Sequence, residues 1–381
     1  MPALPEQSPD ILIVGAGPVG LAAALFLDSH GVGVRLIDKG NNSSTTSRAQ
    51  IVNPRSLELL EENGVAAKIL KESRDVLGVR FYEDWKPVAA LDFTDIPSRY
   101  KMAAIPQART EALLAEALAL RGIAPERGRE FISLKQTGEA VSTLVSSEQS
   151  GEETIVSRIV LGTDGAHSPT RAAIGADWVG HGFPESWPLY DIYLDDPLDR
   201  DHAHVLFVDD GLVFMLCIEP GLWRVFGNVP DLLDHLPAGS NPGAVEWQSS
   251  FHIGDKLAEN IVVGRVALAG DAAHIHSPVG ARGMNLGIED AYVFAACAAD
   301  ALGGNWERLN DYARLRHPVH REVVSRMDKL TTLARGRPKW MALLRHYLIP
   351  GMTRFGPVAH RMCDFITGLD EPTRTNIDRL F

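Results

Sequence analysis

The chain has 381 residues, of which 45% are hydrophobic and 23% charged, a composition typical of a soluble globular protein. Its formal net charge of −12 disfavours nucleic acid and anionic membranes as main partners. Cys217, Cys297 and Cys363 show no metal-ligand spacing, which favours a reducing, cytoplasmic setting. No secretory signal pattern is found, and no apolar run reaches the roughly 18 residues of a transmembrane helix.

The first segment predicts a βαβ unit that binds a dinucleotide. An apolar strand at 10–14 enters GAGPVG at residues 15–20, a helix is expected over 19–30, and a strand over 32–37 ends at Asp38. In this fingerprint the first glycine makes the tight turn, the second lets backbone approach a pyrophosphate, and the third lets helix and strand pack closely. Asp38 is placed to accept from a ribose hydroxyl, and NAD and FAD fit this segment equally well.

The next segments predict two helices and an aromatic, strand-like stretch. Ser56 is a candidate N-cap for a helix that Gly64 ends, and Thr110 is a candidate N-cap for a helix that Gly122 ends. Between them, residues 71–104 read as strands.

Alternating apolar and polar residues then predict strands. Residues 131–137, 140–145 and 154–161 form an expected antiparallel meander whose third strand leads to Asp164 and Gly165. Three further strands are expected over 204–208, 212–218 and 222–229, with Gly-containing turns between them.

A third Gly/Asp turn follows a short strand at 266–269. Asp271, Pro278 and the glycines of 280–283 lead into a helix that is expected from about Met284. Such a strand-to-helix turn presents backbone N–H groups to a ligand in front of the helix, and Asp271 adds a carboxylate suited to ligand hydroxyls.

The three turns read GAGPVG at 15–20, GTDGAHSPTR at 162–171 and GDAAHIHSPVGARGMNLGIEDA at 270–291. In this order they resemble the single-component class A FAD-dependent aromatic hydroxylases, which share the fold of para-hydroxybenzoate hydroxylase. The resemblance covers about residues 10–330. It implies an α/β fold in which a Rossmann-like FAD-binding domain is interleaved with a mostly antiparallel substrate sheet, followed by a helical C-terminal tail. The boundaries expected are 1–75, 105–180 and 261–330 for the FAD domain, 76–104 and 181–260 for the substrate sheet, and 331–381 for the tail.

The resemblance also implies which residues touch the cofactor and the substrate. Arg48 matches an arginine that reaches the flavin phosphates or ribityl chain, Gln107 matches a flavin-contacting glutamine, and Asp271 would hold the ribityl hydroxyls. The full set expected at the cofactor is Gly15, Gly17, Pro18, Val19, Gly20, Asp38, Lys39, Arg48, Gln107, Asp164, Asp271, Pro278, Gly280, Gly283, Met284 and Asn285. Candidates for the substrate pocket are Tyr190, Tyr193, His204, Phe214, Arg224 and Pro278, with ordinary packing as the alternative for each.

The function implied is that of an FAD-dependent monooxygenase. It would take hydride from NADH or NADPH, add O2 at flavin C4a as a hydroperoxide, and hydroxylate a small phenolic or heteroaromatic substrate. The expected partners are that substrate and O2, and the expected state is a monomer or homodimer. The alternatives are an epoxidase, decarboxylating hydroxylase or reductase on the same fold, a weakly catalytic protein that binds a pathway intermediate, and a plain NAD dehydrogenase.

Three further features stay open at this point. Arg282 stands where the family commonly has glutamine, and its cation would either favour an anionic substrate at the flavin edge or pair with an acid. His274 and His276 form an H-x-H without an evident third ligand, so no metal site is expected. No catalytic side chain is assigned, although His204 or a tyrosine would suit a base toward a phenol.

The tail has its own composition. Residues 331–381 hold eight Lys/Arg and four Asp/Glu, a net charge of +4, and Pro338, Pro350 and Pro357 are expected to break them into short amphipathic helices. A helical cap or a dimer face is favoured over membrane docking.

Overall fold

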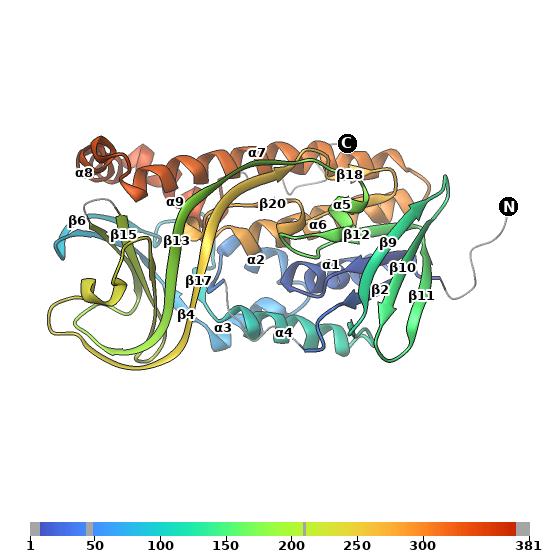
Figure 1. Ribbon diagram of the computed structural model, residues 1–381, viewed down its shortest axis with the longest axis horizontal. Coiled ribbons are helices and arrows are strands. Elements are labelled where there is room, and N and C mark those ends of the chain that lie inside the picture. The colour runs from blue at the N-terminus through green and yellow to red at the C-terminus, as the bar shows by residue number, and fades with distance from the viewer. Residues whose placement is uncertain (1–7, 43–48, 209–210, 371–381) are drawn as a thin grey trace.

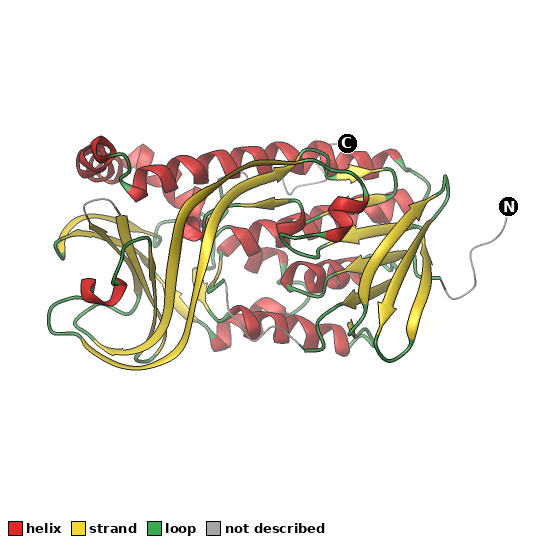
Figure 2. Ribbon diagram, viewed as in Figure 1, coloured by secondary structure: helices red, strands yellow, loops and turns green. Residues whose placement is uncertain are grey.

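The computed structural model describes residues 8–42, 49–208 and 211–370. It confirms the α/β class. Within the described residues four β-sheets combine with helices that cover their faces, and the two largest sheets lie toward opposite ends of an elongated molecule (Figures 1 and 2).

The six-stranded sheet carries the dinucleotide fingerprint. Its order is β18-β19-β12-β1-β2-β8, and its strands are parallel apart from the edge pair β18 and β19. The bounds are β1 Ile11–Val14, β2 Val34–Asp38, β8 Glu126–Arg127, β12 Ile159–Gly162, β18 Val262–Val263 and β19 Val266–Leu268. The central strands β1, β12 and β19 are completely buried, as expected of parallel strands covered on both faces.

Three helices pack beside this sheet: α1 (Pro18–Ser29), α4 (Gln107–Ala119) and α6 (Gly283–Leu302). Helix α1 lies between α4 and α6 and packs against both. Pro18 occupies its first turn, where its missing N–H costs nothing. Residues 19–27 of α1 are all buried, so both neighbours bury apolar surface on it.

The eight-stranded sheet forms the other end of the molecule. Its order is β20-β17-β13-β16-β15-β14-β5-β6, and all neighbours are antiparallel except β14 and β5. The bounds are β5 Gly78–Glu83, β6 Lys86–Asp92, β13 Trp178–Asp195, β14 His202–Val208, β15 Gly211–Glu219, β16 Leu222–Gly227, β17 Asn241–Ala258 and β20 His274–Ile275. The long strands β13 and β17 run side by side toward helix α7 (Glu307–Arg335) (Figure 1).

Two three-stranded sheets complete the β structure. One is the expected meander, β9 (Glu130–Gln136), β10 (Val141–Ser147) and β11 (Gly151–Ser157); the other has the order β3-β7-β4. The bounds of the second sheet are β3 Ile51–Val52, β4 Arg74–Val76 and β7 Met102–Ala104. The strand predicted over 154–161 was wrong as one element: it divides at Arg158 into β11 of the meander and β12 of the six-stranded sheet.

Two helix starts also differ from the prediction. Asn53, not Ser56, caps α2 (Pro54–Leu59), because its side chain accepts from the Ser56 N–H at 2.9 Å. Helix α4 begins at Gln107, three residues before the predicted cap Thr110, and Thr110 is fully buried. Gly64, at φ +72°, begins the unpredicted α3 (Val65–Glu72).

From α6 onward the regular secondary structure of the described residues is helical. Helix α7 (Glu307–Arg335) runs along one side of the molecule, and α8 (Lys339–Arg354) and α9 (Gly356–Thr367) follow it (Figure 1). Breaks at Pro338 and Pro357 are confirmed, whereas Pro350 lies inside α8. The short helix α5 (Pro169–Ala173) follows β12. No helix in the described part of the chain is long and apolar enough to cross a bilayer.

Candidate active site

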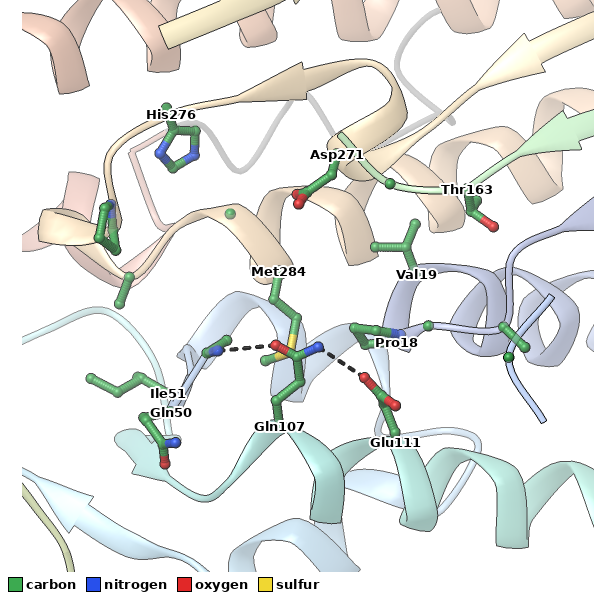
Figure 3. Close-up of a pocket in the computed structure, with 18 of the residues that line it drawn as sticks. Pro18, Val19, Gln50, Ile51, Gln107, Glu111, Thr163, Asp271, His276 and Met284 are labelled. Carbon is green, nitrogen blue, oxygen red and sulfur yellow. Dashed lines mark hydrogen bonds between the residues drawn. The ribbon is translucent and has the colours of Figure 1, made fainter. Parts of the chain in front are cut away.

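A cavity of about 560 Å³ brings the three Gly/Asp turns together, and its volume suits a cofactor or small molecule (Figure 3). The turns contribute Ala16, Gly17, Pro18, Val19, Thr163, Gly165, Asp271, His276, Ser277, Pro278, Ala281, Gly283 and Met284. The remaining lining residues are Asp38, Lys39, Gly40, Asn42, Ala49, Gln50, Ile51, Gln107, Glu111, Arg127, Phe214, Leu216, Arg224 and Phe226.

The glycines of the first turn differ in their surroundings. A Cβ on Gly20 would lie 1.9 Å from the Gly15 carbonyl oxygen, so α1 approaches the strand end only because Gly20 has no side chain. A Cβ on Gly17 would meet nothing within 4 Å, although this residue lines the cavity. Gly17 therefore leaves open space in front of helix α1, where an anionic group fits.

Asp38 at the end of β2 anchors the same turn. Its carboxylate accepts from the backbone N–H groups of Ala16 and Gly40, each at 2.7 Å, and Arg127 lies 3.4 Å away. Two carboxylate oxygens carry about four lone-pair sites, so these contacts leave acceptor capacity for a ribose hydroxyl.

Asp164 of the second turn holds the start of α5. It accepts from the Ser168 hydroxyl, and from the Thr170 N–H at 2.9 Å. Asp164 lines a smaller cavity of about 200 Å³ together with Gly15, Gly17 and Asp38. The side chain thus serves as a local cap at the rim of the first turn.

A buried carboxylate on α6 holds the third turn in place. Asp290 of α6 accepts from the Gly270 N–H at 3.2 Å and pairs with His274, Arg316 and His320, each at 2.7 Å. Burial alone would raise the pKa of Asp290, but His320, Arg316 and His274 hold it well below its ordinary value. Burial lowers the pKa of His320 to about 3, so at physiological pH this ring acts on Asp290 as a neutral hydrogen-bond donor and Arg316 supplies the counter-charge.

His274, Asp290 and His320 also place two ring nitrogens and a carboxylate oxygen within 4.8 Å of one another. All three are fully buried, and the guanidinium of Arg316 occupies the Asp290 carboxylate as well. Because Arg316 already lies beside this carboxylate, its positive charge opposes the binding of a metal cation. The three residues belong to a buried ion-pair network.

Gln107 links α4 to the strand beside the cavity. Its side-chain oxygen accepts from the Ala49 N–H at 3.0 Å, and its amide donates to Glu111 at 2.8 Å (Figure 3). Gln50 and Ile51 lie on the same side of the cavity. The Gln107 side chain thereby positions the segment that faces Met284.

The far end of the cavity is aromatic. Phe214 and Leu216 of β15 lie opposite Phe226 and Arg224 of β16, so the four side chains share one face of the antiparallel pair. Arg224 is 2% exposed and forms a bidentate pair with Asp191, at 2.8 and 2.7 Å. This end suits a flat, apolar ring beside a fixed cation.

The structure brings most of the predicted site residues to the two cavities but not all. Tyr190, Tyr193 and His204 do not line either one. Tyr193 is 44% exposed, and His204 is buried against Tyr82 and the Asp199 carbonyl. Gly20, Gly280 and Asn285 lie behind the lining, and Arg48 falls outside the described residues.

Asn285 and Gly280 have structural contacts instead. Asn285 accepts from the Asn53 N–H at 3.0 Å and donates to the carbonyls of Ile51 and Ala281. A Cβ on Gly280 would lie 2.1 Å from the end of Met327 on α7. Both residues therefore fix the turn before α6 against neighbouring elements.

Sequence reasoning missed several lining residues, among them Gln50, Ile51, Leu216, Phe226, His276 and Ser277. Two of these residues could have been found from strand alternation, because alternate residues of a strand share a face. Leu216 lies two residues after Phe214, and Phe226 lies two residues after Arg224. The H-x-H pattern drew attention to His276 only as a metal ligand.

Arg282 points away from the cavity. Its guanidinium is 1% exposed, donates to the Phe365 carbonyl of α9, and contacts Asp370 at 3.0 Å and Glu289 at 3.7 Å. The expectation of a cation at the flavin edge was wrong for this residue, and the alternative, pairing with an acid, is what the structure shows.

The residues present fit FAD. Gly17 opens a cradle at the N-terminus of α1, and the first turn of α6 presents backbone N–H groups without intrahelical partners beside Gly283 and Met284. Asp38 and Asp271 supply two carboxylates to the cavity lining. Two helix N-termini and two carboxylates suit a ligand with both phosphates and hydroxyls.

Comparisons with known proteins agree with this geometry. The model of the FAD binding domain family matches residues 8–218 and 231–327. The chain is 33% identical to 6-methylpretetramide 4-monooxygenase from Streptomyces rimosus, over 86% of this chain and 62% of the relative. It is 29% identical to pentachlorophenol 4-monooxygenase from Sphingobium chlorophenolicum, over 88% and 67%. The chain thus spans about two thirds or less of the length of these curated relatives.

Among solved structures, p-nitrophenol 4-monooxygenase PnpA from Pseudomonas putida DLL-E4 superposes with a TM-score of 0.85. The alignment covers 95% of this chain and 98% of that one at 22% identity, which shows a shared fold. Because the family model covers most of the sequence, the chain belongs to the FAD binding domain family, and it is similar in sequence to monooxygenases.

Proposed function

We propose that this chain is an FAD-dependent monooxygenase that uses NADH or NADPH and O2 to hydroxylate a small electron-rich aromatic ring. The observation that carries the proposal is the continuity of one cavity. It runs from the dinucleotide turn at Gly17, past the start of α6, to the aromatic face formed by Phe214 and Phe226. A cofactor held at the turns would therefore share the cavity with a ring stacked at the sheet.

The chain's own residues would supply binding and orientation. Bound FAD would supply hydride acceptance and oxygen activation, which no side chain provides. The backbone N–H groups at the start of α6 would stabilise negative charge on the reduced cofactor, and the helix dipole adds about 0.3–1 kcal/mol, or up to about 2 when buried. Asp271 would accept from cofactor hydroxyls.

We further propose that the cofactor and the substrate are bound by the separate parts of the chain that were expected from the sequence. Residues 1–75, 105–180 and 261–330 would hold the cofactor, and residues 76–104 and 181–260 would form the substrate side. The division is supported because the cavity is lined both by Gly17 and Asp271, from the dinucleotide and third turns, and by Arg224, from β16 of the eight-stranded sheet. Residues 331–381 would act as a helical cap.

The test uses purified protein with bound flavin under air. NADH and NADPH are added with a panel of aromatic ligands that includes p-nitrophenol, pentachlorophenol and 6-methylpretetramide, while flavin absorbance and oxygen uptake are followed. Ligand-stimulated flavin reduction with formation of a hydroxylated product is the expected result. A yellow protein that neither nicotinamide reduces, with or without any ligand, would favour the alternative of a flavin-fold binding protein.

A further inference from the structure

His276 lies at the cavity on a tightly held segment. The residues before it pair with β17, with His274 opposite Leu257 and Ile275 opposite Lys256. The residue after it, Ser277, is fully buried, and its N–H donates to Asp255 at 3.1 Å. The backbone of His276 is therefore anchored on both sides, and its ring lines the cavity in Figure 3.

The hydrogen bond of the ring defines its tautomer. Nδ1 of His276 lies 2.8 Å from the Ser277 carbonyl oxygen. A carbonyl only accepts, so Nδ1 carries the proton, and in the neutral ring Nε2 presents a lone pair. Nε2 is buried and has no hydrogen-bond partner among the residues that the structure describes. A buried acceptor left without a donor costs free energy, which a ligand hydroxyl would recover.

The ring stays neutral at physiological pH. Burial lowers the pKa of His276 to about 4, and His274 and Arg282 nearby disfavour the charged form further. A phenol of ordinary pKa, about 10 as for tyrosine, is about six units less acidic than this imidazolium. Complete proton transfer to Nε2 is then disfavoured on the order of a million-fold, so the nitrogen accepts a hydrogen bond without removing the proton.

We propose that His276 is a specificity-determining residue whose Nε2 accepts a hydrogen bond from a free hydroxyl group of a neutral phenolic substrate. The inference rests on the proposed function, because it assumes that an aromatic ring occupies the aromatic end of the cavity. The hydroxyl hydrogen stays on the substrate oxygen, and its hydrogen bond to nitrogen increases electron density on the ring that is to be oxidised. Phe214 and Phe226 would stack the ring, and Nε2 would select its orientation.

The inference predicts rejection of substrates whose hydroxyl is methylated. A methyl ether has no proton to donate, and its methyl group would occupy the space of the hydrogen bond. Sites built to bond a substrate hydroxyl discriminate strongly against analogues without it, because the buried polar group then stays unpaired. We expect at least about tenfold weaker binding of each ether than of its parent phenol.

The experiment measures ligand binding to the flavin-loaded protein from the change in flavin absorbance. Two matched pairs are compared: 4-nitrophenol with 4-nitroanisole, and 1-naphthol with 1-methoxynaphthalene. The variants are His276→Phe, which keeps an aromatic ring without an acceptor, and His276→Gln, which restores an acceptor oxygen. His252→Phe, at an exposed position on β17, is the control.

In the wild-type protein and in His252→Phe, each phenol is expected to bind at least about tenfold more tightly than its ether. In His276→Phe the ratio should fall to within about twofold, and His276→Gln should restore part of it. At a pH below the pKa of 4-nitrophenol itself, the bound probe should show the absorption of the neutral phenol. Equal binding within both pairs, undetectable binding of all four probes, an unchanged ratio in His276→Phe, or bound phenolate would each overturn the proposal.

This binding experiment and the test of the proposed function can fail independently. Binding is read from oxidised flavin and needs neither nicotinamide nor oxygen. A protein that hydroxylates aromatic ligands but does not discriminate the pairs refutes the role of His276 alone. A protein that discriminates them but is never reduced refutes the monooxygenase proposal alone.

Discussion

Replacing Arg282 by glutamine is expected to destabilise the protein without changing its preference for substrate charge. Arg282 lies immediately before α6, but its side chain reaches the C-terminal helix α9. The variant loses charge-assisted hydrogen bonds to the Phe365 carbonyl and to Asp370, and also the packing of the guanidinium 5.2 Å from the centre of the Phe365 ring.

The magnitude follows from the remaining partners. Removing one member of a buried ion pair typically costs about 3–5 kcal/mol, because the partner charge stays buried. Here both acids keep a second cation: Asp370 has Arg326 at 3.4 Å, and Glu289 has Arg316 at 3.2 Å. We therefore take the low end, a loss of about 3 kcal/mol in the free energy of unfolding, which is roughly a hundredfold change in the folding equilibrium.

The assay is urea denaturation of the flavin-loaded proteins, combined with Km values for a neutral and an anionic aromatic substrate. Arg326→Gln is the matched control, because Arg326 is 43% exposed and also faces Asp370, so its loss should cost under about 1 kcal/mol. If Arg282→Gln unfolds at the wild-type urea concentration but raises Km only for the anionic substrate, the reasoning from its contacts is refuted.

Three further predictions follow from the glycine turn and the buried carboxyls. Gly17→Ala should leave the stability of the flavin-free protein within about 0.5 kcal/mol yet weaken FAD binding at least about tenfold, whereas Gly20→Ala should lower both, as flavin titration and thermal melting would show. Asp290→Asn should cost about 3 kcal/mol, because Arg316 loses the nearer of its two carboxylates and keeps only Glu289 at 3.2 Å, and a melting temperature equal to wild type would contradict this. Burial raises the pKa of Asp255 to about 6, so stability is lost as pH rises from about 4 through about 6. Asp255→Asn should remove that loss, about 3 kcal/mol above about pH 6, measured as denaturation midpoints across pH.

Short-range patterns predicted the first βαβ unit of the molecule well. The run from Gly15 to Asp38 places strand, turn, helix and acid within one βαβ unit, so local chemistry determines where each of them lies. The strands β14, β15 and β16 were also found, because the turn signals that include Gly211 and Gly221 separate apolar runs of ordinary length in the sequence.

Features that depend on tertiary contacts were not predictable in the same way. Strands β13 and β17 are 18 residues long and partly exposed on both faces, so they lack a regular apolar alternation. Arg282 and His276 lie within one short motif, yet one reaches α9 and the other the cavity. Such a difference in side-chain direction depends on packing partners far away in sequence.

The pairing of β13 with β17 has a consequence for how substrate range can change. The two strands are paired from Trp178 and Ala258 at one end to Asp195 and Asn241 at the other. Both junctions of segment 178–258 therefore lie on directly paired residues, with Cα atoms roughly 5 Å apart. The corresponding segment of a related protein can replace it, because both ends of the segment join the rest of the chain at neighbouring positions. The replacement must carry a strand that still pairs with β5, as β14 does. Recombination at these two positions would exchange the part of the cavity wall that segment 178–258 supplies and would leave the Gly/Asp turns unchanged.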